Sequence, residues 1–475
     1  MMGRRSLKAK SPCAGFISYT GKTLATLKLV CMRAHFFLAF VLALSVMLPC
    51  SAQPSAKNVR AAERLAARDY AESLHLYRAL VEEEGPRLDL LLGLSESLAG
   101  TGDLAGALAL SERLLTLYPK HGESHAERAE LLAMAGRFEE SLAALNKAVE
   151  LQPTQPYHFV ARGYVLADLQ RFTDANTDFD RAVTLRPDMA IALSGRAYTW
   201  ARLGDFQAAR TDVERAVQLD PELVPALHTR AELNSNDSRY AEALEDFSRA
   251  IKLDDSNVYL RSGRAAVYRV LSRNEDALLD YNRAIELAPK IAEMYSARAE
   301  LLEEIGKTSE ALADHDKAVQ LAEGSGFPLL RRAAFYQRSG DTIKALADYN
   351  AGLASEPEQA WGFLGRGEVR AARADYAGAV SDFDRALELD PNSHYAYVAK
   401  SNALTAAGEL EQASEPLQKL LTLDPDYIPG HLSMGYLWQA RGQDGLAREC
   451  FEKALKLAEH PAVRQEVEEA LQGLK

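Results

Sequence analysis

The chain has 475 residues, of which 47% are hydrophobic and 26% are charged, a composition typical of folded globular proteins. This excludes a disordered, collagen-like or multi-span membrane chain. The 67 acidic residues outnumber the 55 basic ones, giving a net charge of -12. Because binding to a phosphate backbone requires clustered Lys and Arg, we predict no nucleic-acid partner.

Residues 1–52 differ from the rest of the chain in charge. They contain seven basic and no acidic residues, which leaves 48 basic and 67 acidic residues, a net charge of -19, in the remainder. An apolar core at residues 36–48 follows Arg33, and the small residues Cys50 and Ala52 suit a cleavage site. We predict that residues 1–52 are a targeting segment, namely a signal peptide cleaved before Gln53.

This segment predicts a periplasmic or secreted protein. The alternative is an uncleaved segment that anchors the protein to a membrane or holds it there peripherally, although the apolar core is shorter than the roughly 20 residues that span a bilayer. The sequence leaves the start codon open between Met1 and Met32. Of the four cysteines only Cys450 lies outside the segment, so we expect no internal disulfide.

A 34-residue repeat occupies residues 54–459. Pro119, Pro153, Pro187 and Pro221 are spaced by 34 residues, and the same register continues over twelve repeats. With these prolines at position 32, positions 8 and 20 are small in every repeat, and position 24 is aromatic or aliphatic in all but two, which have Ser111 and His315. Positions 20, 24, 27 and 30 predict one buried face of a helix that the proline ends. Glycine at position 15 commonly separates it from an earlier helix.

These columns resemble the tetratricopeptide repeat, which has small residues at positions 8 and 20, an aromatic at 24, Ala at 27 and Pro at 32. The resemblance implies an all-α fold, a right-handed α-solenoid of about twelve helix-turn-helix repeats, in which the first helix (helix A) lines the concave face. In the sixth repeat, the polar run 234–238 predicts a shortened helix A. Residues 460–475 predict a C-terminal capping helix, because Pro461 can start a helix that carries an apolar stripe.

Two columns depart from the family pattern together. Seven repeats have Arg at position 7 and Asp at position 23, whereas the second repeat has Leu94 and Leu110 there. This joint change predicts that the two positions touch, and we favour a structural ion-pair ladder over a row of arginines offered to an acidic ligand. The pairs are Arg162 with Asp178, Arg196 with Asp212, Arg230 with Asp246, Arg264 with Asp280, Arg298 with Asp314, Arg332 with Asp348, and Arg366 with Asp382.

The candidate binding surface is the groove lined by helix A. If the resemblance holds, positions 2, 5, 9 and 12 face it. Aromatic residues beside carboxylates suit a peptide with apolar anchors and some basic character; the alternative is that the position 2 aromatics pack against the preceding repeat. The predicted groove residues are Tyr157, Tyr164, Tyr198, Tyr259, Phe327, Trp361, Tyr395, Tyr436, Glu232, Glu300 and Glu368.

No catalytic, cofactor or metal motif emerges from the sequence. His121 and His125 are four residues apart but lack a third ligand. Position 5 holds no Lys, so the chain is not expected to be a carboxylate clamp for chaperone C-terminal tails. We therefore predict a non-catalytic scaffold or adaptor that binds other proteins or peptides in the cell envelope. The alternative is an accessory subunit that recruits substrate to a catalytic partner, in a glycan-assembly or secretion complex.

Overall fold

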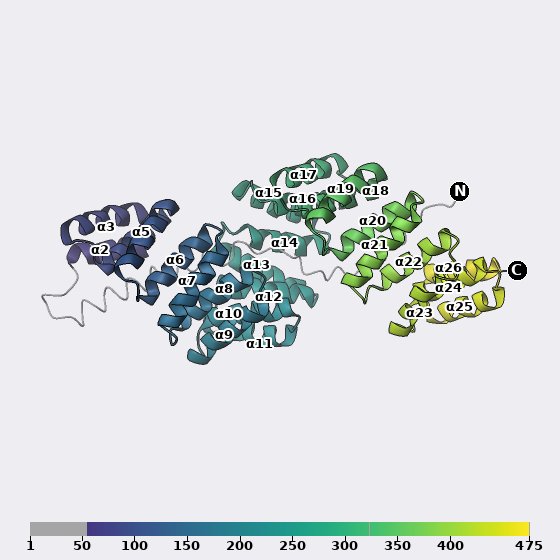
Figure 1. The fold of residues 1–475 in the computed structure, drawn as a ribbon, viewed down its shortest axis with the longest axis horizontal. Coiled ribbons are helices and arrows are strands. Elements are labelled where there is room, and N and C mark those ends of the chain that lie inside the picture. The colour runs from purple at the N-terminus through teal and green to yellow at the C-terminus, as the bar shows by residue number, and fades with distance from the viewer. Residues whose placement is uncertain (1–54, 323, 475) are drawn as a thin grey trace. The chain divides into compact units, whose positions relative to one another are not determined.

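The computed structural model describes residues 55–322 and 324–474, and every regular element in these ranges is an α-helix (Figure 1). The predicted targeting segment and its cleavage site before Gln53 lie outside these residues. The chain divides into two compact parts, an N-terminal part ending at Leu271 and a C-terminal part beginning at Ser272. None of the described helices is both long and apolar enough to cross a membrane.

The N-terminal part consists of six helix pairs and one further helix. The second helix of each pair is called helix B. The pairs are α2 (Ala56–Ala66) with α3 (Tyr70–Glu84), α4 (Leu88–Gly100) with α5 (Leu104–Leu117), α6 (Gly122–Met134) with α7 (Phe138–Leu151), α8 (Pro156–Asp168) with α9 (Phe172–Leu185), α10 (Ala190–Leu203) with α11 (Phe206–Leu219), and α12 (Val224–Asn236) with α13 (Tyr240–Leu253), followed by α14 (Val258–Val270).

The C-terminal part continues the same pattern and ends with a single helix. Its elements are α15 (Asn274–Leu287), then α16 (Ala292–Glu304) with α17 (Thr308–Leu321), α18 (Phe327–Ser339) with α19 (Thr342–Ser355), α20 (Ala360–Ala372) with α21 (Tyr376–Leu389), α22 (His394–Ala406) with α23 (Ser414–Leu423), α24 (Ile428–Ala440) with α25 (Asp444–Leu457), and finally α26 (Pro461–Gln472). The predicted all-α solenoid of helix pairs with a C-terminal capping helix is confirmed.

The turn between helices A and B requires a left-handed residue at position 15. Seven repeats place glycine there with φ between 72° and 88°, as Gly204 does at the end of α10. The other five repeats place a residue with a side chain at the same position, with φ between 57° and 63°. Since a Cβ makes this conformation costly, these five turns are strained. They are Arg68, Gln170, Ser238, Ser272 and Ala374.

The core is built on the residue at position 24 of helix B. Seven repeats place a fully buried Tyr or Phe there, and the ring of Phe179 lies close to glycines on two successive A helices. A Cβ on Gly163, at position 8 of the same repeat, would lie 2.9 Å from Phe179, and one on Gly195, at position 6 of the next, would lie 2.3 Å from it. Phe179 therefore joins two repeats, because both glycines leave space for its ring.

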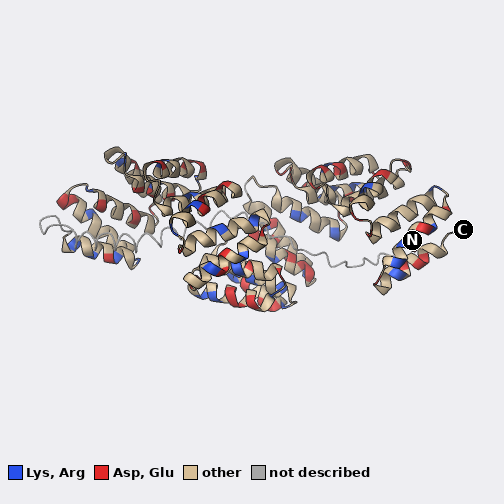
Figure 2. Ribbon diagram, turned by 90° about the horizontal axis from the view of Figure 1, so that it is seen from below, with Lys and Arg blue, Asp and Glu red and all other residues tan. Residues whose placement is uncertain are grey.

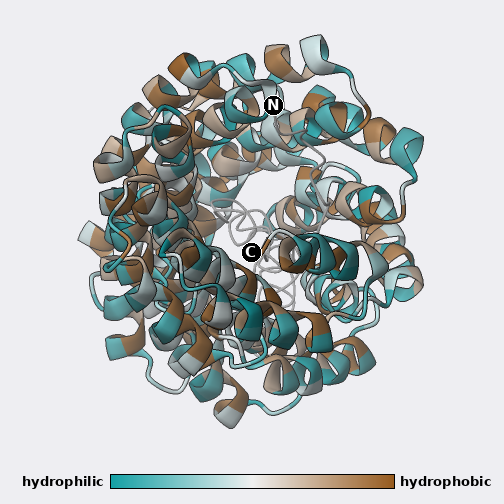
Figure 3. Ribbon diagram, turned by 90° about the vertical axis from the view of Figure 1, so that its right-hand side faces the viewer, coloured by the Kyte–Doolittle hydropathy of each residue, from teal (hydrophilic) through white to brown (hydrophobic). Residues whose placement is uncertain are grey.

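The expected buried face of helix B is correct for three of its four positions. Positions 20, 24 and 27 are buried, but several position 30 leucines are not: Leu117 is 46% exposed, Leu253 is 42% exposed and Leu423 is 52% exposed. These leucines lie at the last residue of the helix. Figure 3 shows the corresponding mixture of apolar and polar residues along individual helices.

Two local features complete the fold. The predicted shortening of helix A in the sixth repeat is wrong: α12 runs to Asn236, and Asn234 is buried within it, where its side chain donates a hydrogen bond to Asp246. At the other end, the capping helix α26 buries Val467 against a cluster that includes Phe451 and Ala454 of the last repeat. Covering the apolar face of the last repeat keeps an array soluble.

Candidate functional site

The arginine and aspartate columns form salt bridges between helices A and B. In six repeats the guanidinium donates two hydrogen bonds to the Asp carboxylate: Arg162 Nε and Nη2, for example, each lie 2.7 Å from an oxygen of Asp178. The other five pairs are Arg196 with Asp212, Arg230 with Asp246, Arg298 with Asp314, Arg332 with Asp348, and Arg366 with Asp382. The seventh predicted pair straddles the division between the two parts, with Arg264 in one and Asp280 in the other.

A third column completes this ladder and was missed by the sequence reasoning. The remaining guanidinium nitrogen reaches position 25 of the preceding repeat, so that Arg162 Nη1 donates to Asn146 Oδ1 at 2.9 Å. The same acceptor position is filled in seven other repeats, by Glu112, Asp180, Glu214, Ser248, Asn282, Asp316 and Asn350. An acceptor side chain occupies it in every repeat except the first, which has Arg78, and that shared property was the available signal.

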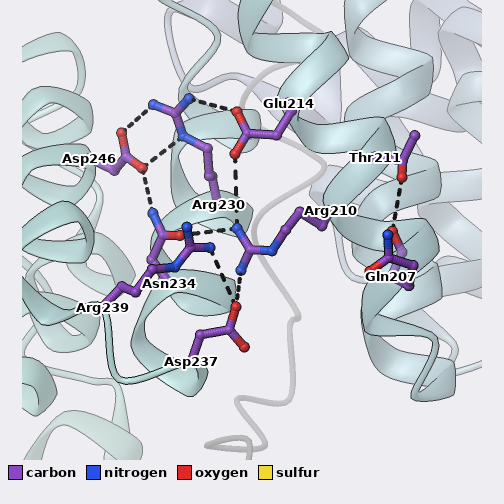
Figure 4. Close-up of polar contacts among 9 residues, drawn as sticks. All are labelled: Gln207, Arg210, Thr211, Glu214, Arg230, Asn234, Asp237, Arg239 and Asp246. Carbon is purple, nitrogen blue, oxygen red and sulfur yellow. Dashed lines mark hydrogen bonds and ion pairs between the residues drawn. The ribbon is translucent and has the colours of Figure 1, made fainter.

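The sixth repeat shows the most extended form of this network (Figure 4). Arg230 donates to Asp246 at 2.6 and 2.8 Å and to Glu214 at 3.3 Å. Asn234 donates to the same Asp246 and accepts a hydrogen bond from Arg210 at 3.1 Å. These side chains come from three successive helices, α11, α12 and α13.

The ladder is arranged for structure rather than for ligand binding. In the six pairs, the Arg side chains are 16–23% exposed and the Asp side chains 3–12% exposed. The hydrogen bonds to the carboxylates raise the pKa of five of these arginines, as at Arg162 with Asp178. Because most donors of each guanidinium are already used within the array, an acidic ligand would have to displace these bonds.

The predicted groove residues all lie on A helices. In the N-terminal part the aromatics are partly buried. Tyr164 packs edge-on to Phe179 with ring centroids 5.1 Å apart, and Arg186 lies over the ring of Tyr157 at 5.3 Å. Tyr198 on α10 packs edge-on to a neighbouring ring at 6.4 Å. Tyr259, on α14, is also partly buried.

In the C-terminal part the aromatics are more exposed. Phe327 is partly buried and packs edge-on to Trp361 of the next repeat, with ring centroids 5.7 Å apart. Trp361 itself is 36% exposed, Tyr395 is 54% exposed and Tyr436 is 44% exposed. These last three lie on α20, α22 and α24, the A helices of three successive repeats, so the aromatic surface continues along this part of the array.

The predicted groove carboxylates are held by polar contacts. Glu300 pairs with Arg331 of the next repeat. Glu368 accepts hydrogen bonds from Tyr395 and from Gln337, the latter at 2.5 Å. Glu232 lies 3.6 Å from His228. In the described part of the chain, acidic and basic residues are interspersed along the helices (Figure 2), and no cluster of three or more His, Cys, Asp or Glu could hold a metal ion.

Comparison with known proteins agrees with the repeat pattern. Two family models described as tetratricopeptide repeat match, one at residues 59–121, 160–223, 230–290, 267–326 and 332–393, the other at 98–162 and 370–433. The chain belongs to the tetratricopeptide repeat family. Its repeats are of a kind that binds other proteins, and it is accordingly a protein-interaction scaffold. The predicted family is thus confirmed.

Solved structures and curated proteins add little to this assignment. The crystal structure of yeast Tom70 is similar to the chain at 16% sequence identity, with a TM-score of 0.44, and the match covers 91% of this chain and 95% of that one. No curated protein matches the chain.

Proposed function

We propose that the protein is a non-catalytic scaffold of the cell envelope that binds partner proteins through the face of its A helices. The observation that carries this proposal is the row of solvent-exposed aromatics Trp361, Tyr395 and Tyr436 on three successive A helices. Exposed aromatic rings supply large contact areas at little cost in side-chain entropy, and they dominate the binding energy of many protein interfaces.

The polar residues beside these rings support the same interpretation. Tyr395 donates to Glu368, which is also held by Gln337, so this carboxylate has a fixed position next to an exposed ring. Such an arrangement supplies an apolar contact and a hydrogen-bond acceptor within one stretch of surface. An extended or helical peptide with apolar anchors fits this pattern.

The test is capture of partners from a cell-envelope extract with the full mature chain. The variant in which Trp361, Tyr395 and Tyr436 are all replaced by alanine should lose the captured proteins. The matched control replaces Leu279 and Ile343, which are 70% and 71% exposed on B helices, and should retain them. Equal capture by both variants would contradict the proposed surface. Capture of one enzyme in fixed stoichiometry would assign the accessory-subunit role instead.

The envelope location has its own support and its own test. It depends on the basic residues and the apolar core at 36–48 within residues 1–52. N-terminal sequencing of the mature protein should give Gln53 as its first residue. A first residue upstream of Met32 would contradict cleavage and export.

A further inference from the structure

Asp168 is the last residue of α8, one helical turn beyond Tyr164 on the same A helix. A carboxylate at the C-terminal end of a helix lies at the negative end of the helix dipole, which disfavours its charge. A nearby cation would therefore stabilise the charged form of Asp168.

No such cation or donor is present among the described residues. The Oδ2 atom of Asp168 is buried without a hydrogen-bond partner, and the residue has no ion pair. Burial raises the pKa of Asp168 to about 7. Two other carboxylates on A helices are compensated, Glu300 by Arg331, and Glu303 by His315 and Arg338.

Asp168 interacts electrostatically with two tyrosines. The pKa of Tyr164 on the same helix and that of Tyr198 on α10 are raised, chiefly by burial and in part by the charge of Asp168, so both phenols lie within its electrostatic reach. The charge of Glu232, in the following repeat, also raises the pKa of Tyr198, and the charge of Arg202 lowers it. The guanidinium of Arg202 lies 5.2 Å from the centre of the Phe172 ring. Two carboxylates and two phenol rings thus occupy three successive A helices.

We propose that Asp168, which shares α8 with Tyr164 and lies on a helix that contacts the α10 of Tyr198, receives a lysine or arginine side chain of the partner protein. Oδ2 is buried, but the residue as a whole is only partly buried, so part of it can be reached by a ligand. An ammonium or guanidinium group would supply the missing ion pair, and its alkyl chain would pack on the tyrosine rings. The net charge of -19 outside residues 1–52 favours a basic partner.

The proposal fixes the pH dependence of binding. The free carboxyl titrates near pH 7, and a bound cation lowers its pKa because it stabilises the charged form. Affinity should therefore rise as pH increases through 7. Between pH 6 and pH 8 the ionised fraction of the free carboxyl changes about tenfold, and so should the dissociation constant.

This inference rests on the proposed function. The experiment selects 12-residue peptides that bind the full mature chain from a random display library. The selected peptides should share a Lys or Arg. Replacing that residue with norleucine should weaken binding at least about tenfold to the native chain but not to Asp168→Asn. The matched control is Asp174→Asn, on α9 of the same repeat, whose carboxylate is 54% exposed and paired with Arg171; it should bind like the native chain.

Two failures are distinguishable. Peptides without a shared basic residue, bound equally by Asp168→Asn and lost in the triple alanine variant of Trp361, Tyr395 and Tyr436, would contradict only this inference. Selection of no peptide at all would contradict the proposed function and the inference with it. A pH profile identical for the native chain and Asp168→Asn would also overturn the role of Asp168.

Discussion

The ion-pair ladder makes the sharpest prediction about stability, and the pair Arg162 and Asp178 is suited to testing it. Arg162 is 20% exposed and Asp178 is 6% exposed, and two hydrogen bonds of 2.7 Å join them. The perturbations are Arg162→Leu, Asp178→Leu and the double change. The second repeat already has leucine at both positions, as Leu94 and Leu110, so the fold accommodates the apolar pair.

The two single changes should differ in cost. Arg162→Leu leaves a buried carboxylate without its partner, which should cost about 3 kcal/mol. Asp178→Leu leaves an arginine that keeps its hydrogen bond to Asn146 and reaches solvent, which should cost about 2 kcal/mol. The double variant leaves no uncompensated charge between the helices and should also cost about 2 kcal/mol, so that the coupling free energy is about 3 kcal/mol.

The assay must report on the repeat that is changed, because a repeat array does not unfold in a single step. Native-state hydrogen exchange of the backbone amides in α8 and α9 measures the local opening free energy of this repeat. Amides of the distant helix α25 serve as the internal control. Additive effects of the two single changes would refute direct coupling between Arg162 and Asp178.

Three further predictions concern packing, backbone strain and charge. Gly195→Ala should destabilise the array by about 1–3 kcal/mol in a denaturation assay, because the added Cβ would lie 2.3 Å from Phe179. The control Gly445→Ala should stabilise it by about 0.5–1 kcal/mol in the same assay, because this helical position has no atom within 4 Å of the added Cβ. Ala374→Gly should stabilise the turn between α20 and α21 by about 0.5–1 kcal/mol by relieving a φ of 63°, and loss of local exchange protection there would contradict the strain. Asp168→Asn should stabilise the protein by about 2 kcal/mol at pH 8 but hardly at pH 4. Burial raises the folded-state pKa of Asp168 to about 7, so ionisation of this carboxyl destabilises the native state as pH rises from about 4 to 7. Identical melting-temperature shifts at both pH values would refute this.

The repeat pattern predicted most of the fold because each column has one physical role. Small residues at positions 8 and 20 and prolines at position 32 define two helices and their end, without knowledge of the tertiary structure. The Arg and Asp columns indicated a contact because the second repeat replaces both residues with leucine, although the first and third repeats keep Arg60 and Arg128 without the Asp. Position 25 was missed because Glu, Asn, Asp and Ser all serve as acceptors there, so no single residue type marks the column.

The candidate site was less predictable than the fold. The sequence marks aromatics on A helices but not which of them are exposed, because exposure depends on the neighbouring repeat: Phe327 is partly covered by Trp361, whereas Tyr395 is 54% exposed. Asp168 lies at position 13, next to the positions expected to face the groove. Its lack of a partner depends on side chains from other helices and has no signature in the sequence.

The central claim is that partners contact the A helices, and site-specific photocrosslinking tests it most directly. A photoreactive phenylalanine analogue is placed in the full mature chain at position 361 on α20 or, in a second variant, at position 343 on α19. Partners in an envelope extract should crosslink at position 361 and not at position 343, which is the more exposed of the two. Crosslinks at position 343 alone would contradict the central claim.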